Sequence, residues 1–305
     1  MNTVSALSTH YSTPSTVKDF ITLMKPGVMS LVVFTGMAGM LVAEFGSFGH
    51  INILQQLLAV ACIALGSGAG GAMNMWYDRD IDAVMNRTKK RPVPAGIIEA
   101  DDALAFGLFL AALSVMLMGL ALNWVAAGLL AFAIFFYVVI YTMALKRRTP
   151  QNIVIGGAAG AFPPMIGWAA VTGDISLQSF LLFMIIFLWT PPHFWALALY
   201  KNGDYERAGV PMMPVVRGAK STKRQMLFYT YLLSGCTLLL PVLGMAGNIY
   251  SVCTIILDTA FLYYVYKTLA DNSDKWPRKT FLFSILYLFV LFTIMMVDGL
   301  FFHYQ

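Results

Sequence analysis

The sequence predicts an all-α membrane protein: nine transmembrane helices in a single bundle around a cavity open to the cytoplasmic side. Of the 305 residues, 59% are hydrophobic and 11% are charged, and the mean hydropathy is +0.72. Soluble domains carry about 25% charged residues. The apolar residues also gather in segments of roughly the 20 residues that a bilayer core requires. The net charge of +5 therefore reflects membrane topology, and no nucleic-acid partner is predicted.

Nine apolar segments follow a polar N-terminal arm. The arm, residues 1–22, has no basic stretch ahead of an apolar core, so we expect no signal peptide. The rest of the chain, 23–305, is predicted to form one nine-helix domain. Its segments lie at 26–45, 51–73, 103–121, 124–144, 153–172, 178–199, 226–246, 249–269 and 280–301.

All 20 Lys and Arg residues lie in alternate connections between these segments. Cytoplasmic loops of membrane proteins carry an excess of Lys and Arg. The pattern therefore predicts a cytoplasmic N-terminal arm and a C-terminus on the far side. We expect the loop residue Lys223 and the interfacial residue Asp298 to be solvated.

The most informative polar motif, residues 74–94, directly follows the second apolar segment. Asn74, Asp78 and Asp82 are four residues apart, so in a helix they share one face over about 12 Å. Basic residues follow at once: Arg87, Lys89, Lys90 and Arg91. Carboxylates hold a hard cation, and cations neutralise phosphate oxygens. The pattern predicts a magnesium–diphosphate site at a solvated helix end; helix capping with ion pairing is the structural alternative.

A second polar group lies four segments later and contains His193, Tyr200, Lys201, Asp204 and Tyr205. Because four is an even number, the second and sixth segments run in the same direction, which indicates a degenerate parallel repeat. His193 follows Pro191-Pro192 inside an apolar segment, where ionisable residues are functional by default. The alternative is a hydrogen bond to carbonyl groups that a proline break frees.

Three further features have a structural interpretation. Pro163-Pro164 are expected to kink or break the fifth segment, and the glycines near them permit close helix packing. Asp258 is alone in the eighth segment, where a structural hydrogen bond is at least as good an interpretation as a chemical role. Trp195 is one of several aromatic residues that could line a cavity.

These parts together fit one class of reaction. A membrane cavity with a magnesium–diphosphate site at its mouth suits an amphipathic diphosphate with a long apolar tail. The metal and the cations would help an allylic C–O bond to ionise. Aromatic faces could stabilise the carbocation, and a carbon of a second apolar substrate would capture it. The sequence has no serine or cysteine nucleophile motif.

The motif from Asn74 to Asp82, followed by Arg87–Pro92, resembles the intramembrane prenyltransferase superfamily typified by the UbiA enzymes, which have nine helices and two Asp-rich motifs. Residues 78–96, 145–168 and 191–216 are similar to its protoheme IX farnesyltransferase (haem O synthase) branch. The likeness covers residues 20–300. The second Asp-rich motif departs from the general pattern.

The resemblance implies an intramembrane prenyltransferase domain with Mg²⁺ as cofactor. It implies farnesyl diphosphate as donor, haem B (protoheme IX) as acceptor and haem O as product. A haem vinyl group would attack the farnesyl cation, and water would complete the reaction. The location would be the bacterial inner (plasma) membrane, with the active site toward the cytoplasm. Haem A synthase and a terminal oxidase assembly are the candidate partners.

The predicted site residues fall into three sets. The expected metal ligands are Asn74, Asp78, Asp82 and Asp204, and the three aspartates are also expected to be catalytic together with His193. The expected diphosphate ligands are Arg87, Lys90, Arg91, Arg147, Arg148 and Lys201. The residues expected to face the cavity and haem are His193, Tyr200, Trp195 and Tyr205. Among the four histidines, His10, His50 and His303 lie outside the spanning core, which leaves His193.

Two alternatives stay open at this stage. One is a sister prenyltransferase that acts on an aromatic or quinone precursor; a complete second Asp-rich motif and no embedded histidine would favour it. The other is a transporter of anionic lipids, since broken helices and inward basic loops suit that function too. Acidic residues at the same mouth disfavour anion transport without a metal.

Overall fold

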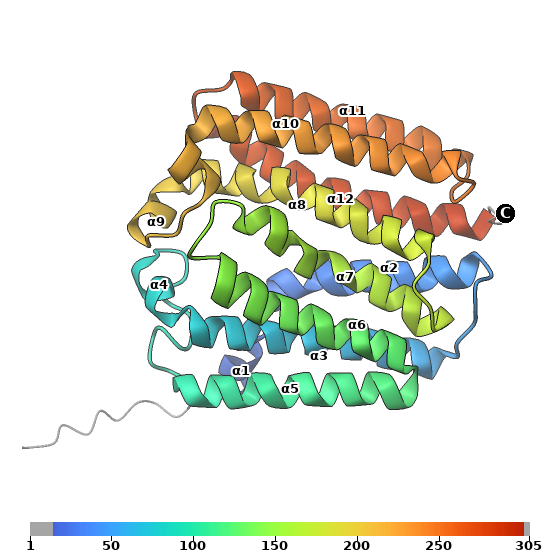
Figure 1. The fold of residues 1–305 in the computed structure, drawn as a ribbon, viewed down its shortest axis with the longest axis horizontal. Coiled ribbons are helices and arrows are strands. Elements are labelled where there is room, and N and C mark those ends of the chain that lie inside the picture. The colour runs from blue at the N-terminus through green and yellow to red at the C-terminus, as the bar shows by residue number, and fades with distance from the viewer. Residues whose placement is uncertain (1–14, 302–305) are drawn as a thin grey trace, which may run out of the picture.

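The computed structural model describes residues 15–301, so that His10 and His303 lie outside the described residues. Nine helical stretches of the described chain are long and apolar enough to cross a membrane, which confirms the predicted all-α fold with nine spanning helices (Figure 1). The elements are α1 (Val17–Leu23), α2 (Pro26–Phe45), α3 (Ile53–Tyr77), α4 (Arg79–Val84), α5 (Ala100–Ala121), α6 (Trp124–Phe135), the π-helix η1 (Phe136–Leu145), α7 (Asn152–Thr172), α8 (Leu177–Tyr200), α9 (Asn202–Arg207), α10 (Met213–Val242), α11 (Asn248–Ala270) and α12 (Lys275–Phe301).

Most helix boundaries lie close to the predicted segments. α6 and η1 together form one membrane-crossing stretch, Trp124–Leu145. The exception is α10, which begins at Met213, whereas the apolar pattern predicts a start at residue 226. The additional turns are polar and basic, and Gly218 interrupts them at φ +76°, a conformation that glycine adopts without steric cost.

The two proline pairs do not break their helices, so the predicted break is wrong; the kink that was predicted as its alternative stays a prediction. Pro163-Pro164 and Pro191-Pro192 lie inside the continuous helices α7 and α8. Membrane helices tolerate proline when neighbouring helices surround the freed backbone groups. The predicted close packing is confirmed: a Cβ atom on Gly39 would lie 2.1 Å from the carbonyl oxygen of Pro164, and one on Gly167 only 1.9 Å from that of Gly36.

The order of elements repeats along the chain. Each half has two long helices, one short helix and two more long helices. The first half is α2, α3, α4, α5 and α6–η1, and the second half is α7, α8, α9, α10 and α11. α2 packs against α7, and α12 packs against α2, α8 and α11. The short helices α1, α4 and α9 lie at the same end of the bundle (Figure 1). The structure thus has the arrangement that the parallel repeat predicts.

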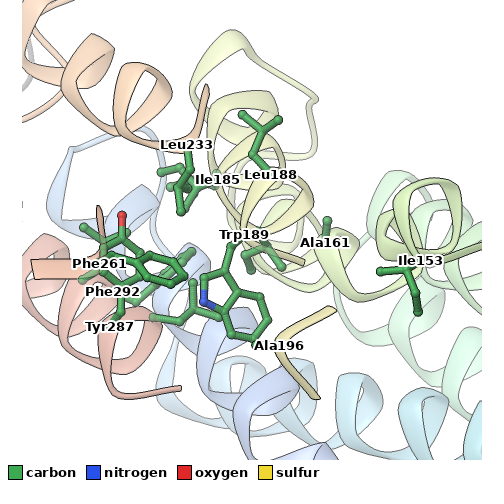
Figure 2. Packing of buried hydrophobic residues seen from close by; sticks show 14 of the residues in the cluster. Ile153, Ala161, Ile185, Leu188, Trp189, Ala196, Leu233, Phe261, Tyr287 and Phe292 are labelled. Carbon is green, nitrogen blue, oxygen red and sulfur yellow. The ribbon is translucent and has the colours of Figure 1, made fainter. Parts of the chain in front are cut away.

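The largest buried cluster joins α8 to the last three helices. Figure 2 shows Trp189 of α8 beside Phe261 of α11 and Tyr287 of α12. Within this cluster Asp258 accepts hydrogen bonds from the Thr237 hydroxyl at 2.8 Å and from the Tyr287 hydroxyl at 2.6 Å. Asp258 therefore links α10, α11 and α12, which agrees with its structural interpretation.

Two charged residues that the sequence predicts to be solvated are buried. Asp298 is 2% exposed and accepts hydrogen bonds from the backbone N–H groups of Gly247 and Tyr250, at 2.5 and 3.1 Å, at the start of α11. Lys223 is also buried, and its ammonium group donates to the backbone carbonyl of Asp271. In both cases the partner is a backbone group near a helix end.

Candidate active site

The oxygen ligands predicted in the first motif lie where α3 meets α4. Asp78 is the turn residue between the two helices, with φ −88° and ψ 9°. The Asn74 amide nitrogen donates to the Asp78 carboxylate at 2.8 Å, so these two side chains share a face as predicted. Asp78 and Asp82 are 0% and 2% exposed. The prediction of a solvated helix end is therefore wrong, because the carboxylates are enclosed by cationic partners.

Two of the predicted arginines are among these partners. Arg91 Nη1 lies 2.6 Å from the Asp82 carboxylate. Arg147 reaches Asp78 at 3.5 Å, and its two terminal nitrogens bind both oxygens of the exposed Asp80 at 2.6 and 2.7 Å. Hydrogen bonds from Arg147 lower the pKa of Asp80. Arg147 thus links the loop after η1 to the start of α4.

Two lysines that were not predicted as site residues complete the cluster. The Lys25 ammonium lies 2.5 Å from the amide oxygen of Asn74, and that of Lys146 forms an ion pair with Asp78. Burial, with the charges of Arg91 and Lys146, lowers the pKa of Lys25 to about 7. The available signals were local: Lys25 directly precedes a helix-starting proline, and Lys146 opens a run of three basic residues.

The π-helix η1 supplies an aromatic wall beside the carboxylates. The rings of Tyr137 and Tyr141 stack with centroids 5.7 Å apart. Tyr137 fits against Gly70 of α3, and Tyr141 against Gly156 of α7; Cβ atoms at these glycines would lie 2.9 and 2.1 Å from the respective rings. Two glycines on different helices therefore make room for this pair of rings.

Thr142 connects η1 to the metal-ligand candidates. Its hydroxyl accepts a hydrogen bond from the Asn74 amide nitrogen at 3.0 Å and donates to the backbone carbonyl of Tyr137 at 2.8 Å. The Asn74 side chain is consequently fixed by three groups: Thr142, Asp78 and Lys25. Its oxygen faces the lysine, and its nitrogen faces the carboxylate and the hydroxyl.

The second polar group meets the first at one point. Arg87, in the loop after α4, forms a hydrogen bond with the buried hydroxyl group of Tyr205 on α9. Asp204 forms an ion pair with Arg207 on the same helix. Lys201 is exposed, with its ammonium 5.6 Å from the ring centroid of Tyr200. Arg87 and Tyr205 thus connect the two halves of the repeat, but Asp204 and Lys201 face other partners.

The donor set suits a hard cation only in part. Asn74, Asp78 and Asp82 offer oxygen atoms alone, as Mg²⁺ prefers. Across residues 15–301, however, no group of three or more His, Cys, Asp and Glu side chains is close enough to hold a metal ion, and Asp204 is paired with Arg207. Two of the predicted diphosphate ligands, Lys90 and Arg148, are exposed and lie in none of the contacts described above.

His193 lies between α8 and α12. Its Nδ1 is 2.6 Å from the Ser284 hydroxyl, which itself donates to the Phe281 carbonyl at 2.7 Å. Since the hydroxyl hydrogen is used there, Nδ1 carries the hydrogen of the first bond, and Nε2 has a free lone pair. Trp189 and Phe281 stack on the imidazole at 4.2 and 4.7 Å between centroids. Side chains of α12, and not a proline break, orient this ring.

Trp195 lies on the other side of α8. Two residues along an α-helix correspond to a rotation of about 200°, so Trp195 and His193 project in nearly opposite directions. The Trp195 ring is fully buried against Tyr229 of α10, at 5.7 Å between centroids. The structure therefore does not bring Trp195 together with His193.

An apolar groove of about 600 Å³ is lined by residues of α3, α5 and α6–η1. It is lined by Met73, Trp76, Leu104, Leu108, Ala111, Ala112, Val115, Met116, Ala131, Ile134, Phe135, Val138, Val139 and Met143. The residue after Met73 and the residue before Met143 are Asn74 and Thr142, which belong to the site. α3 and η1 thus present an apolar face to the groove and a polar face to the carboxylates.

These contacts define what the charged end can do chemically. Lys25, Arg91, Lys146 and Arg147 are held within one cluster with two buried carboxylates. Several cations around a low-dielectric site stabilise a polyanion far better than they would in water. Such a site suits the binding and departure of a diphosphate.

Comparison with known proteins agrees with this arrangement. The UbiA prenyltransferase family matches residues 32–292. A protoheme IX farnesyltransferase of Brucella ovis is 57% identical over 290 residues, which cover 94% of this chain and 92% of that protein.

Solved structures share the fold. A digeranylgeranylglyceryl phosphate synthase covers 93% of this chain and 98% of its own, with a TM-score of 0.75 at 20% identity. A UbiA homolog from Archaeoglobus fulgidus bound to GPP and Mg²⁺ covers 91% of this chain and 99% of its own, with a TM-score of 0.61 at 15% identity. With the family match over most of its length, the chain belongs to the UbiA prenyltransferase family.

Proposed function

We propose that this prenyltransferase transfers the farnesyl group of farnesyl diphosphate to a vinyl group of haem B, giving haem O. The observation that carries the proposal is the enclosed cluster of Lys25, Arg91 and Lys146 around Asn74, Asp78 and Asp82. The similar protein from Brucella ovis is named a protoheme IX farnesyltransferase, which supports haem B as the acceptor.

The donor diphosphate would bind at the end of the bundle that carries α1, α4 and α9. Asn74, Asp78 and Asp82 would hold Mg²⁺, as the oxygen donors of the first motif suit this ion; the GPP and Mg²⁺ in the Archaeoglobus fulgidus homolog support the same choice. When bound, Mg²⁺ would withdraw charge from the departing diphosphate. We also assign Asp204 to this site, although its present partner is Arg207.

The chain's own cations would complete this binding. We assign Arg87, Lys90, Arg91, Arg147, Arg148 and Lys201 to the phosphate oxygens. Arg91 is the best placed, because its guanidinium already lies against the buried Asp82. Arg147 would first have to release Asp80, which it binds through two hydrogen bonds.

Departure of the diphosphate would leave an allylic cation at farnesyl C1. Tyr137 and Tyr141 stack on each other close enough to Asp78 for its charge to act on both, and their ring faces would stabilise this cation. The terminal carbon of the haem vinyl group would form the new C–C bond with its π electrons. Water would then add to the resulting cation and release a proton, which leaves a hydroxyethylfarnesyl side chain and free diphosphate.

The acceptor would lie near His193. With Trp189 and Phe281 on its two faces, the imidazole has only its edge available for a ligand. The Nε2 lone pair could bind haem iron or place the vinyl group. Tyr200 and Tyr205 lie toward the charged end of the same half and would line the passage between acceptor and donor. For Trp195, which faces α10, we propose a place in the wall rather than a contact with haem.

The predicted topology would place this site toward the cytoplasm of a bacterial cell, in its inner membrane. Haem A synthase and a terminal oxidase assembly would then be the recipients of the product. These assignments depend on the distribution of Lys and Arg over the connections.

Two measurements test the function. Mass spectrometry of haems extracted from membranes with and without this protein should detect haem O only when the protein is present. Purified protein should release diphosphate from farnesyl diphosphate only with both Mg²⁺ and haem B. Diphosphate release with an aromatic or quinone precursor instead would identify a sister prenyltransferase. Transport of an anionic lipid without diphosphate release would identify a transporter.

A further inference from the structure

The corner between α1 and α2 holds one residue in an unfavourable backbone conformation. Lys25 has φ 58° and ψ 59°, in the left-handed region, and directly precedes Pro26. Its neighbour Leu23 is fully buried against α3, and a Cβ atom on Gly71 would lie 3.1 Å from the carbonyl oxygens of Leu23 and Met24. The corner is therefore pressed against α3, and glycine would satisfy its geometry better than lysine does.

The side chain of Lys25 is costly as well. The Lys25 side chain is partly exposed, but its ammonium group is desolvated and contacts the neutral amide of Asn74 at 2.5 Å. Among the described residues, no ion pair joins Lys25 to a carboxylate, because Asp78 and Asp82 are bound by Lys146 and Arg91. A buried cation without an anionic partner lowers the stability of a fold. Strained backbone and desolvated charge on one residue are typical of a functional site.

We infer that Lys25 is a diphosphate-binding residue. Without the prenyl donor its ammonium group contacts the Asn74 amide oxygen, and when the donor binds the ammonium group moves to contact a phosphate oxygen instead. This inference rests on the proposed function. The movement would supply the missing anionic partner, and it would release the Asn74 oxygen for a metal ion. The charges of Arg91 and Lys146 repel the ammonium, and those of Asp82 and Asp78 attract it; a phosphate bound between the cations would relieve the repulsion.

Thermal stability distinguishes this role from a structural one. A lysine that holds the corner together should lower the melting temperature when it is replaced. Replacement of a lysine that binds the diphosphate should not lower the melting temperature, since the replacement removes backbone strain and an unpaired charge. Lys25→Gly removes both, whereas Lys25→Met removes only the charge. Lys18→Met is the matched control, because Lys18 is exposed on α1.

The experiment uses the full chain in lipid nanodiscs with Mg²⁺. Calorimetry measures the affinity for inorganic diphosphate and for farnesyl thiodiphosphate, a slowly reacting donor analogue, and light scattering on heating gives the melting temperature. We expect Lys25→Met and Lys25→Gly to weaken both affinities at least tenfold without lowering the melting temperature. Lys25→Arg should keep most of the affinity, and Lys18→Met should match the unmodified protein.

Two results would overturn the inference: affinities within twofold of the unmodified protein for Lys25→Met, or a melting temperature that falls in both variants together with the affinity. If Lys25→Met does not fold, Lys25→Gly decides alone. Failure of the unmodified protein itself to bind either probe would reject the proposed donor, and with it the role of Lys25.

Discussion

The hydroxyl group of Ser284 on α12 fixes the ring of His193 on α8. The 2.6 Å contact with Nδ1 and the onward bond to the Phe281 carbonyl leave Nε2 as the unprotonated nitrogen. The indole nitrogen of Trp189 also binds this turn of α12, at 2.8 Å from the Ser284 carbonyl oxygen. Histidine ligands of metals are commonly oriented by a hydrogen bond to the other ring nitrogen.

The first prediction concerns this pair. His193→Ala should change the Soret spectrum of bound haem B and greatly reduce turnover. Ser284→Ala should shift the spectrum in the same direction and reduce haem affinity by about 10–100-fold, the usual range for a residue that orients a ligand. Titration of haem B into the folded variants measures both effects, and the affinity for farnesyl diphosphate should not change.

Thr293→Ala is the matched control for Ser284, because the Thr293 hydroxyl lies on the same helix and donates to the backbone carbonyl of Phe289. Normal haem affinity, spectrum and turnover in His193→Ala would mean that this histidine serves only to join α8 to α12.

The second prediction concerns the metal ligands. Asp78→Asn and Asp82→Asn should lower turnover by about 10²–10³-fold, as the loss of a key charge in an active site does. Asparagine is preferable to alanine here, because Asp78 is fully buried between Lys146 and Arg147. A smaller residue would leave those cations without a partner and would destabilise the fold.

Binding of Mn²⁺, followed by electron paramagnetic resonance, gives a readout that does not depend on turnover. Asp80→Asn is the control, since Asp80 is exposed and pairs with Arg147 alone. Near-normal haem O formation by Asp78→Asn at limiting Mg²⁺ would contradict the ligand assignment.

The third prediction ranks the cations. Neutral replacement of a diphosphate ligand should raise the KM for farnesyl diphosphate far more than the KM for haem B. The effect should be largest for Arg91→Gln, because Arg91 contacts the buried Asp82. The neighbouring exposed residue Lys90 provides the comparison, and Lys90→Gln should have only a small effect.

Steady-state kinetics of single replacements at Arg87, Lys90, Arg91, Arg147, Arg148 and Lys201 would check this ranking. Equal effects at Lys90 and Arg91 would show that the charge acts from a distance. An unchanged donor KM in all six would exclude these residues from diphosphate binding.

The fourth prediction concerns the space beside Gly156 that the Tyr141 ring occupies. A methyl group at Gly156 would lie 2.1 Å from the Tyr141 ring, whereas the space around Gly160, one turn further along α7, is open. Gly156→Ala should therefore destabilise the protein by about 1–3 kcal/mol through overpacking and reduce turnover by displacing the tyrosine. Gly160→Ala should change stability by less than about 1 kcal/mol. Thermal unfolding of both variants in one detergent would test this, and equal melting temperatures would contradict it.

Much of the fold was predictable, because hydropathy and the positions of Lys and Arg follow directly from the cost of placing charge in a bilayer. The failures concern partners that local sequence does not specify. Asp298 caps the start of α11 from another helix, and Lys223 binds a distant carbonyl. Pro191-Pro192 continue through α8 because the surrounding helices support them.

The site was predicted in part for a similar reason. Asn74 and Asp78 were found because Asp78 caps the end of α3, where its backbone N–H still bonds the Asn74 carbonyl and the regular helical spacing is kept. Lys146 was missed because it lies nine residues after Tyr137. In an α-helix this separation would place the two side chains on opposite sides, about 180° apart. The wider turn of η1 brings Tyr137 and Lys146 to the same carboxylates. Lys25 was missed because only its unusual backbone angles turn it toward Asn74.

The number of crossings has a practical consequence. Because nine helices of the described chain, an odd number, are long and apolar enough to cross a membrane, we expect residue 15 and residue 301 to emerge into different compartments. A reporter that matures only outside the cytoplasm, fused in turn to either end, should be active at one end alone. Since α4 and α9 lie at the end of the bundle where α1 lies (Figure 1), the fusion at the N-terminal end would identify the compartment from which a water-soluble diphosphate head group enters and leaves: silence there would mean the cytoplasm, and activity the opposite side.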